Sequence, residues 1–284
     1  MVPDDTPPPS GSTAPNPTPP TSKQPDKKIL PMKSSLAAAL MILFAGLMVP
    51  AAWFFRPGRS FVILVALMIL FMIVLGLKIC GRYAGILIND RNLMSLSRFQ
   101  MILWTVLILS AFLTAAIERI HYGGTADALA IALDEKLWML LGISTASLVG
   151  TPIVQSTKKV QQPDPDAVDR AAETLNESSD DINANSQGVL YANSDAKDAA
   201  FTDMFEGDEV GNTAYVDVSK VQMFFFTLVA VLSYGTVLFT WLSEWQALLN
   251  PAAFPVLNAG LIAILGISHA GFLGSQSTTK TPTT

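Results

Sequence analysis

Six long apolar segments constrain the architecture of this chain. They cover residues 35–55, 60–79, 99–117, 137–155, 221–241 and 253–273. A bilayer core of about 30 Å is crossed by about 20 helical residues, and each segment is close to that length. Only 14% of the 284 residues are charged, against about 25% in soluble domains. Because a chain in lipid must satisfy its own backbone hydrogen bonds, we expect an all-α polytopic membrane protein with six transmembrane helices.

The first apolar segment allows a second interpretation, a cleaved signal peptide. Lysines precede it, and small residues lie near Ala51. However, about 30 residues stand before the apolar core, and the run continues through Phe55. Both features are unusual for a signal peptide. We therefore expect a retained helix that forms a transmembrane hairpin, residues 34–90, with the second segment.

Two short motifs each occur twice. "SRFQMILWT" (97–105) returns as "SKVQMFFFT" (219–227), and "LGISTASLVG" (141–150) returns as "LGISHAGFLG" (265–274). The motifs keep their order and nearly keep their spacing, which predicts a duplicated helix pair made of the third and fourth and of the fifth and sixth helices. Because each repeat has two spans, we expect the copies to be parallel and not inverted.

The repeated motifs supply candidates for helix packing. In each copy the first motif gathers polar side chains on one helix face. An unpaired amide in hydrocarbon is unfavourable by several kcal/mol, so each glutamine is expected to bond to a neighbouring helix. The second motif places small residues four apart, which lets helix backbones approach closely. The candidates are Ser97, Gln100, Thr105, Ser219, Gln222 and Thr227 in the polar motif and Gly142, Ala146, Gly150, Gly266, Ala270 and Gly274 in the small-residue motif.

The polar faces have an alternative interpretation, the lining of a path through the membrane. His269 adds to it as an ionisable residue inside a predicted span, where such residues are functional candidates. Its counterpart in the first copy is Thr145, so the duplication does not require a titrating group there. We prefer a packing role for His269, held by a hydrogen bond.

The distribution of Lys and Arg predicts the orientation. With both termini in the cytoplasm, basic residues gather on the inner side, and the outer side keeps only Arg56, Arg59, Arg119 and Lys136. Aromatic anchors agree, because they fall at the predicted outer ends of the helices. These anchors are Trp53, Tyr122, Trp138, Trp241 and Trp245. We expect the inner (plasma) membrane of a bacterial cell.

The remaining segments are expected to be soluble. Residues 1–33 are rich in Pro, Thr and Ser, which is typical of a disordered cytoplasmic tail. Repeat one (91–155) and repeat two (218–275) are joined by an acidic cytoplasmic loop (156–217), expected to be largely disordered, and residues 276–284 form a C-terminal tail. Within the loop, "DPDAVDRAAETLN" is predicted to form a short helix. "TDMFEGDEVGNTAYVDVS" is predicted to pack against the membrane domain.

Known catalytic motifs are missing from the sequence. It has no P-loop, HExxH or GxSxG motif, and it has one cysteine and two histidines. We expect no catalytic residues, cofactor or metal, and the acidic balance argues against nucleic acid. The preferred function is a non-enzymatic assembly or scaffold component of an inner-membrane complex. Its expected partners are the lipid bilayer, further copies or other membrane subunits, and a cytoplasmic protein bound by the tail or the acidic loop. The alternative is a channel or passive facilitator lined by the Gln and Ser/Thr faces.

Overall fold

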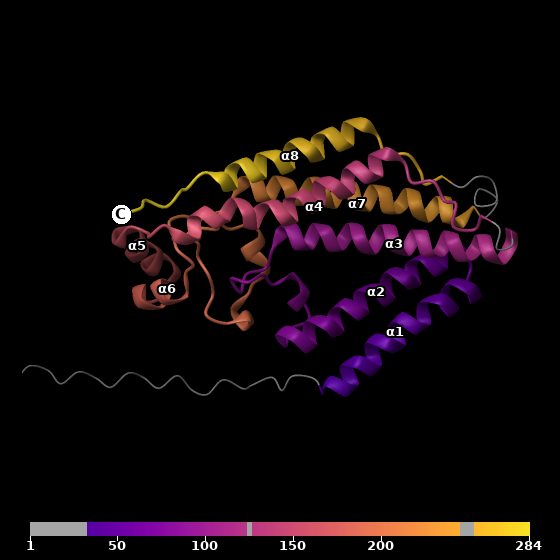
Figure 1. Ribbon diagram of the computed structural model, residues 1–284, viewed down its shortest axis with the longest axis horizontal. Coiled ribbons are helices and arrows are strands. Elements are labelled where there is room, and N and C mark those ends of the chain that lie inside the picture. Colours follow the sequence, from indigo (N-terminus) through magenta and orange to yellow (C-terminus); the bar gives the residue numbers. More distant parts are fainter. Residues whose placement is uncertain (1–32, 124–126, 245–252) are drawn as a thin grey trace, which may run out of the picture. The chain divides into compact units, whose positions relative to one another are not determined.

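The computed structural model describes residues 33–123, 127–244 and 253–284. These residues contain six helices that are long and apolar enough to cross a membrane, and none of them forms a strand. The six are α1 (Ser34–Phe54), α2 (Pro57–Cys80), α3 (Leu96–Gly123), α4 (Glu135–Gln155), α7 (Val218–Ser243) and α8 (Ala259–Ser277) (Figure 1). The predicted all-helical chain with six transmembrane helices is confirmed. Two further predictions, the disordered tail up to residue 32 and the anchor Trp245, lie outside the described residues.

Local residue types explain several helix ends. Pro57 opens α2, a position where its missing N–H is not needed, and Gly81 ends α2 with a left-handed φ of 69°. Asp134, Asp217 and Asn258 cap α4, α7 and α8, because each side chain accepts a hydrogen bond from the backbone N–H two residues further on. Side-chain caps of this kind satisfy donors that a helix leaves open at its start.

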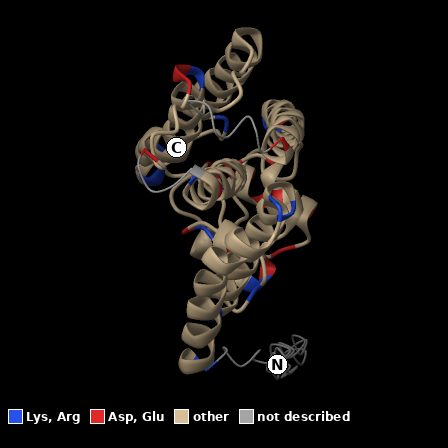
Figure 2. Ribbon diagram, turned by 90° about the vertical axis from the view of Figure 1, so that its right-hand side faces the viewer, with Lys and Arg blue, Asp and Glu red and all other residues tan. Residues whose placement is uncertain are grey.

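The third transmembrane helix is central to the packing. α3 contacts α1, α2, α4 and α7, and both α4 and α7 contact α8. In Figure 1, α3, α4, α7 and α8 run side by side, and α1 lies along α2. Trp104 and Ala111 of α3 are buried in one hydrophobic cluster with Leu137 of α4 and Leu238 of α7. Figure 2 shows few charged residues along the helices, as expected for surfaces that face lipid.

Residues 156–217 fold into a small domain, so the prediction of a largely disordered loop is wrong. This connecting domain contains η2 (Ser156–Val160), α5 (Pro165–Leu175), α6 (Ser179–Asn185), η3 (Ala196–Asp198) and η4 (Phe201–Met204). Its core joins Val168, Ile182 and Val210 to Leu93, which follows η1 (Gly85–Leu87) in the connection between α2 and α3. Six of the seven buried residues of this cluster belong to the loop, and Leu93 is the seventh. The domain therefore has a core of its own that a residue from another part of the chain completes.

Two smaller predictions for the loop are confirmed. α5 forms within the predicted short helix. The last part of the domain packs against the transmembrane helices, because Met204 shares a buried cluster with Met223 of α7 and Phe272 of α8. The rings of Phe205 and Phe224 lie beside them, with centroids 5.0 Å apart.

The C-terminal residues are part of the same structure. α8 continues to Ser277, and the residues after it lie against the connecting domain. The buried Thr281 accepts a hydrogen bond on Oγ1 from the Gly211 N–H at 2.9 Å. The backbone oxygen of Pro282 accepts one from the Asp164 N–H at 2.9 Å. The predicted tail thus contributes to the domain that precedes α7.

Both copies of the polar motif begin at the second residue of a helix, Ser97 in α3 and Ser219 in α7. The motif therefore marks equivalent positions along two helices. Equivalent positions in two helices do not show that the helix pairs share an origin. A common origin of the two helix pairs therefore stays a prediction.

Gly188 gives a direct test of the folded connecting domain. Its φ is +64°, and a Cβ there would lie 2.3 Å from the backbone oxygen of Lys158. We predict that Gly188→Ala destabilises the domain by at least about 1–2 kcal/mol, the penalty for a left-handed alanine. In detergent-solubilised protein, trypsin should then cut after Arg170 and Lys197 much faster than in the unsubstituted chain.

Gly142→Ala is the matched control, since no atom lies within 4 Å of a Cβ placed there. Its digestion should match that of the unsubstituted chain. Rapid cleavage of all three proteins at the same rate would mean that residues 156–217 are unfolded.

Candidate functional site

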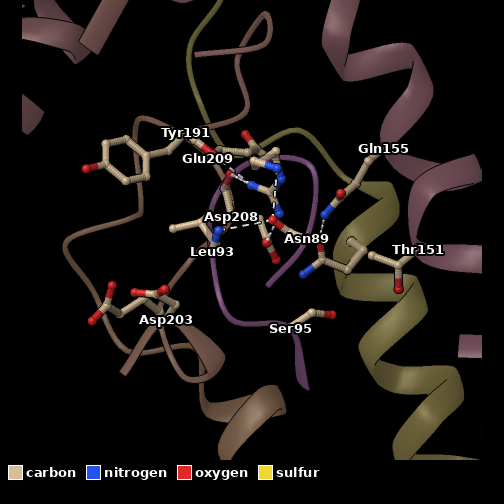
Figure 3. A network of polar contacts seen from close by, with 12 residues as sticks. Asn89, Leu93, Ser95, Thr151, Gln155, Tyr191, Asp203, Asp208 and Glu209 are labelled. Carbon is tan, nitrogen blue, oxygen red and sulfur yellow. Dashed lines mark hydrogen bonds and ion pairs between the residues drawn. The ribbon is translucent and has the colours of Figure 1, made fainter. Parts of the chain in front are cut away.

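A network of ion pairs joins the connecting domain to the transmembrane helices (Figure 3). Arg91 belongs to the connection between α2 and α3, and Lys220 lies in the first turn of α7. The Arg91 guanidinium pairs with one carboxylate oxygen of Asp208, and Lys220 Nζ lies 2.8 Å from the other. Arg91 also donates to the backbone oxygens of Tyr191 and Asp208, both at 2.9 Å. Three separate parts of the chain thus meet at one carboxylate.

The charge of Asp208 depends on these two cations. Burial alone would raise the pKa of Asp208, but Lys220 and Arg91 outweigh it and hold the pKa well below its usual range. Asp203 behaves in the opposite way. Burial raises the pKa of Asp203, and the hydrogen bonds it accepts from the Met94 and Ala200 N–H groups offset this only in part.

A second ion pair holds the C-terminal segment. Lys158 Nζ lies 2.6 Å from Glu209 Oε1, and both side chains are 2% exposed. The other oxygen of Glu209 accepts hydrogen bonds from the backbone N–H groups of Lys280 and Thr281, at 2.7 Å each. Lys158 also donates to the backbone oxygen of Thr278 at 2.8 Å. Since an unpaired buried charge is strongly destabilising, the pair holds η2, the rest of the connecting domain and the C-terminal residues together.

A cavity of about 470 Å³ lies beside the first network and is the candidate site. This volume is within the range of about 300–1,000 Å³ that is usual for small-molecule sites. Its lining combines apolar side chains from the transmembrane helices with charged side chains from the connections and from the first turns of α3 and α7. The apolar residues include Met101, Ile102, Leu148, Pro152 and Phe272, and the charged residues are Asp90, Arg91, Arg98, Lys159, Asp203, Asp208 and Lys220.

The polar motif of repeat one makes the predicted contact between helices. Gln100 is fully buried, and its Nε2 donates to Thr227 Oγ1 at 2.7 Å. A longer hydrogen bond, 3.4 Å, reaches the backbone oxygen of Met223. Ser97 is also buried and lines the cavity, and Thr105 is partly buried. The α3–α7 contact therefore joins a residue of one motif copy to a residue of the other.

The polar motif of repeat two has different surroundings. Gln222 is exposed on α7, and the described residues do not form the contact predicted for it. Ser219 donates from Oγ to Asp217 at 2.5 Å, and Asp217 in turn caps α7. The two copies are therefore not used in the same way.

The small-residue motifs do not form the main contact between α4 and α8. Gly142, Ala146, Ala270 and Gly274 are exposed, and only Gly150 and Gly266 are partly buried. One glycine of each motif does lie in the contact, because a Cβ at Gly150 would be 3.4 Å from Leu273 of α8 and a Cβ at Gly266 would be 3.7 Å from Ile143 of α4. Ser147 Oγ lies 2.5 Å from His269 Nδ1, and Gln155 Nε2 donates to Gln276 Oε1 at 2.9 Å. His269 is buried and hydrogen-bonded, which matches the preferred packing role.

Sequence analysis missed the residues that hold the connecting domain, namely Arg91, Lys158, Asp208 and Glu209. The basic residues near helix ends were interpreted as topology signals, and the acidic ones as a solvated loop. One signal was available for the α4–α8 contact. Gln155 and Gln276 are 121 residues apart, close to the spacing of the repeated motifs.

Among the described residues, no group of three or more His, Cys, Asp or Glu side chains is placed to hold a metal ion. Comparison with protein-family models, with curated proteins and with solved structures gave no match. The surroundings of the site residues therefore carry the functional argument.

The two glutamines provide a matched pair of substitutions. Gln100→Leu removes the hydrogen bonds to Thr227 and Met223, and we predict a loss of about 1–2 kcal/mol in the free energy of unfolding. Gln222→Leu should change it by less than about 0.5 kcal/mol, because surface substitutions away from contacts have small effects. Thermal unfolding of both variants in detergent measures the difference. If the two substitutions lowered the free energy of unfolding equally, the buried contact of Gln100 would be contradicted.

Asp208 is expected to stabilise the folded state in a pH-dependent way. Because its pKa is lower folded than unfolded, its contribution is complete at neutral pH and is lost as the pH falls below about 4. Asp208→Asn leaves two cations unpaired and should lower stability at pH 7 by about 3–5 kcal/mol. The difference in the free energy of unfolding between Asp208→Asn and the unsubstituted chain should become smaller as the pH falls below about 4.

Asp90→Asn is the control for this measurement. Asp90 pairs with Lys159 at 3.0 Å, but its side chain is 67% exposed. An exposed pair contributes less than about 1 kcal/mol, so this variant should unfold almost like the unsubstituted chain. If the two aspartate variants were equally stable at pH 7, the Asp208 network would not hold the domain.

Proposed function

We propose that this integral membrane protein is a non-enzymatic scaffold, an assembly component of an inner-membrane complex with both termini in the cytoplasm. One observation carries the proposal. Asp208 of the connecting domain pairs with the buried Lys220 of α7 and with the buried Arg91 of the α2–α3 connection, and Glu209 accepts hydrogen bonds from the backbone N–H groups of Lys280 and Thr281, which follow α8. Attachment at several points holds the domain in one position, which suits a platform for other proteins.

The outer surface of the connecting domain supports a protein partner. α5 and α6 carry acidic side chains that are exposed, namely Asp166, Asp169, Glu173, Asp180 and Asp181. Such a surface attracts a basic protein surface and repels nucleic acid. With the predicted orientation, this surface faces the cytoplasm.

Exposed small residues support contact with other membrane subunits or with further copies. Gly142 and Ala146 on α4 and Ala270 and Gly274 on α8 face away from the chain's own helices. A Cβ at Gly142 or Gly274 would have no atom within 4 Å. In lipid, small residues at a helix surface allow another helix to approach closely.

The alternative, a channel or facilitator, has one observation in its favour. Among the described residues, buried side-chain oxygens of the spans without a hydrogen-bond partner are found on Ser144, Ser268, Glu118 (Oε2) and Gln100 (Oε1). Other polar side chains of the spans bond to one another, as in Gln100–Thr227 and Ser147–His269. Side chains that are paired in this way support packing better than a water-filled path.

Gly274→Leu tests the scaffold proposal. The space around Gly274 lets the chain fold with the larger side chain, but a neighbouring subunit would be displaced. We predict that the unsubstituted chain has the native mass of a larger assembly in mild detergent and that Gly274→Leu lowers it. Gly46→Leu is the control, because Gly46 on α1 is also exposed and has no atom within 4 Å of a Cβ.

A flux assay on the purified chain in liposomes separates the two functions. A scaffold should give no flux above that of empty liposomes. Flux that Gln100→Leu alters, with an unchanged amount of folded protein, would support the channel and count against the scaffold.

A further inference from the structure

The cavity described above has one lining cation without a carboxylate partner. Arg91 and Lys220 pair with Asp208, and Lys159 pairs with Asp90. Arg98, at the start of α3, donates from Nη1 to the backbone oxygen of Ile88 at 2.6 Å. No described carboxylate lies within ion-pair distance of Arg98. The lining thus leaves one positive charge for an anion.

The third carboxylate of the lining does not neutralise Arg98. One oxygen of Asp203 accepts hydrogen bonds from the Met94 and Ala200 N–H groups, both at 2.9 Å. Its burial raises the pKa of this carboxyl group. The lining as a whole therefore holds four basic and three acidic side chains.

Ser97 provides a hydrogen-bond donor beside Arg98. It lines the cavity and is only 3% exposed, yet the described residues give its hydroxyl no hydrogen-bond partner. The Ser97 oxygen is not among the fully buried atoms that lack a partner, so it is accessible from the cavity. An oxygen of a bound ligand would satisfy it.

The apolar part of the cavity lies further along the transmembrane helices. Ser97 and Arg98 are in the first turn of α3, and Met101 and Ile102 follow in the second. Leu148 and Pro152 of α4 also line this part. Going into the span, the lining changes from charged to apolar, as a lipid changes from headgroup to acyl chain.

We infer that this cavity binds an anionic phospholipid, with its phosphate against Arg98 and Ser97 and the first part of one acyl chain against Met101, Ile102 and Leu148. Basic pockets between transmembrane helices at the membrane boundary recognise anionic headgroups in this way. A volume of about 470 Å³ accommodates only part of a phospholipid, so the remainder lies in the bilayer. Inorganic phosphate would meet the same Arg98 and Ser97, but only a lipid uses the apolar part.

The test is a titration of the whole 284-residue chain, delipidated in a neutral detergent and followed by native mass spectrometry. The ligands are phosphatidylglycerol, phosphatidylcholine and inorganic phosphate. We expect phosphatidylglycerol to bind at least about tenfold more tightly than phosphatidylcholine, and Arg98→Gln to weaken it about tenfold, as for the loss of one charge-assisted hydrogen bond. Arg59→Gln removes an exposed cation at the start of α2 and should leave binding unchanged.

Two further variants keep the test informative if Arg98→Gln does not fold. Ser97→Ala removes the unpaired donor, and Leu148→Trp fills the apolar part without changing a charge. Both should weaken phosphatidylglycerol binding, and Leu148→Trp should not affect phosphate. Equal affinity for the two lipids would overturn the inference, as would unchanged lipid binding in these variants. Phosphate binding as tight as lipid binding would also overturn it, because the site would then take a small anion.

Discussion

The pairing of Asp208 with Arg91 and Lys220 is the interaction on which the rest of the structure depends. Charges removed from water are tolerated only when they are paired and hydrogen-bonded. The three residues belong to the α2–α3 connection, the connecting domain and the first turn of α7. All three parts must therefore be in place before any of the charges is satisfied. The pair Lys158–Glu209 extends the same constraint to η2, which follows α4, and to the C-terminal residues.

Within the bilayer, polar contacts have a comparable role. In lipid the hydrophobic effect does not drive helices together, so packing and hydrogen bonds between helices decide which faces meet. Gln100–Thr227 joins α3 to α7, and Ser147–His269 and Gln155–Gln276 join α4 to α8. These contacts lie inside the chain and leave Gly142, Ala146, Ala270 and Gly274 on the outer faces of α4 and α8. A protein with such an interior and such an outer face is well suited to assemble with others, which agrees with the proposed scaffold.

The two copies of the polar motif show which structural features a repeated sequence pattern predicts and which it does not. Each copy of the motif stands at the start of an apolar segment. Gln100 and Gln222 therefore take equivalent positions near the start of their helices. Their environments differ, because α3 is surrounded by four helices and this part of α7 has an open side. The same reason applies to the glycines and alanines of the second motif. Periodicity indicates which residues share a face, but it does not say which face another helix covers.

The sequence by itself determined the membrane class, the number of spans and the short helix α5, because length, hydropathy and helix capping are local properties. Only the tertiary structure decided that residues 156–217 are folded. Leu93, Arg91 and the residues around Thr281 complete that domain and are distant from it along the chain, and Lys220 follows it in the first turn of α7. The acidic loop looks solvated when it is considered alone. Asp208 becomes internal only because Arg91 and Lys220, from other segments, neutralise it, and this is a property of the assembled chain.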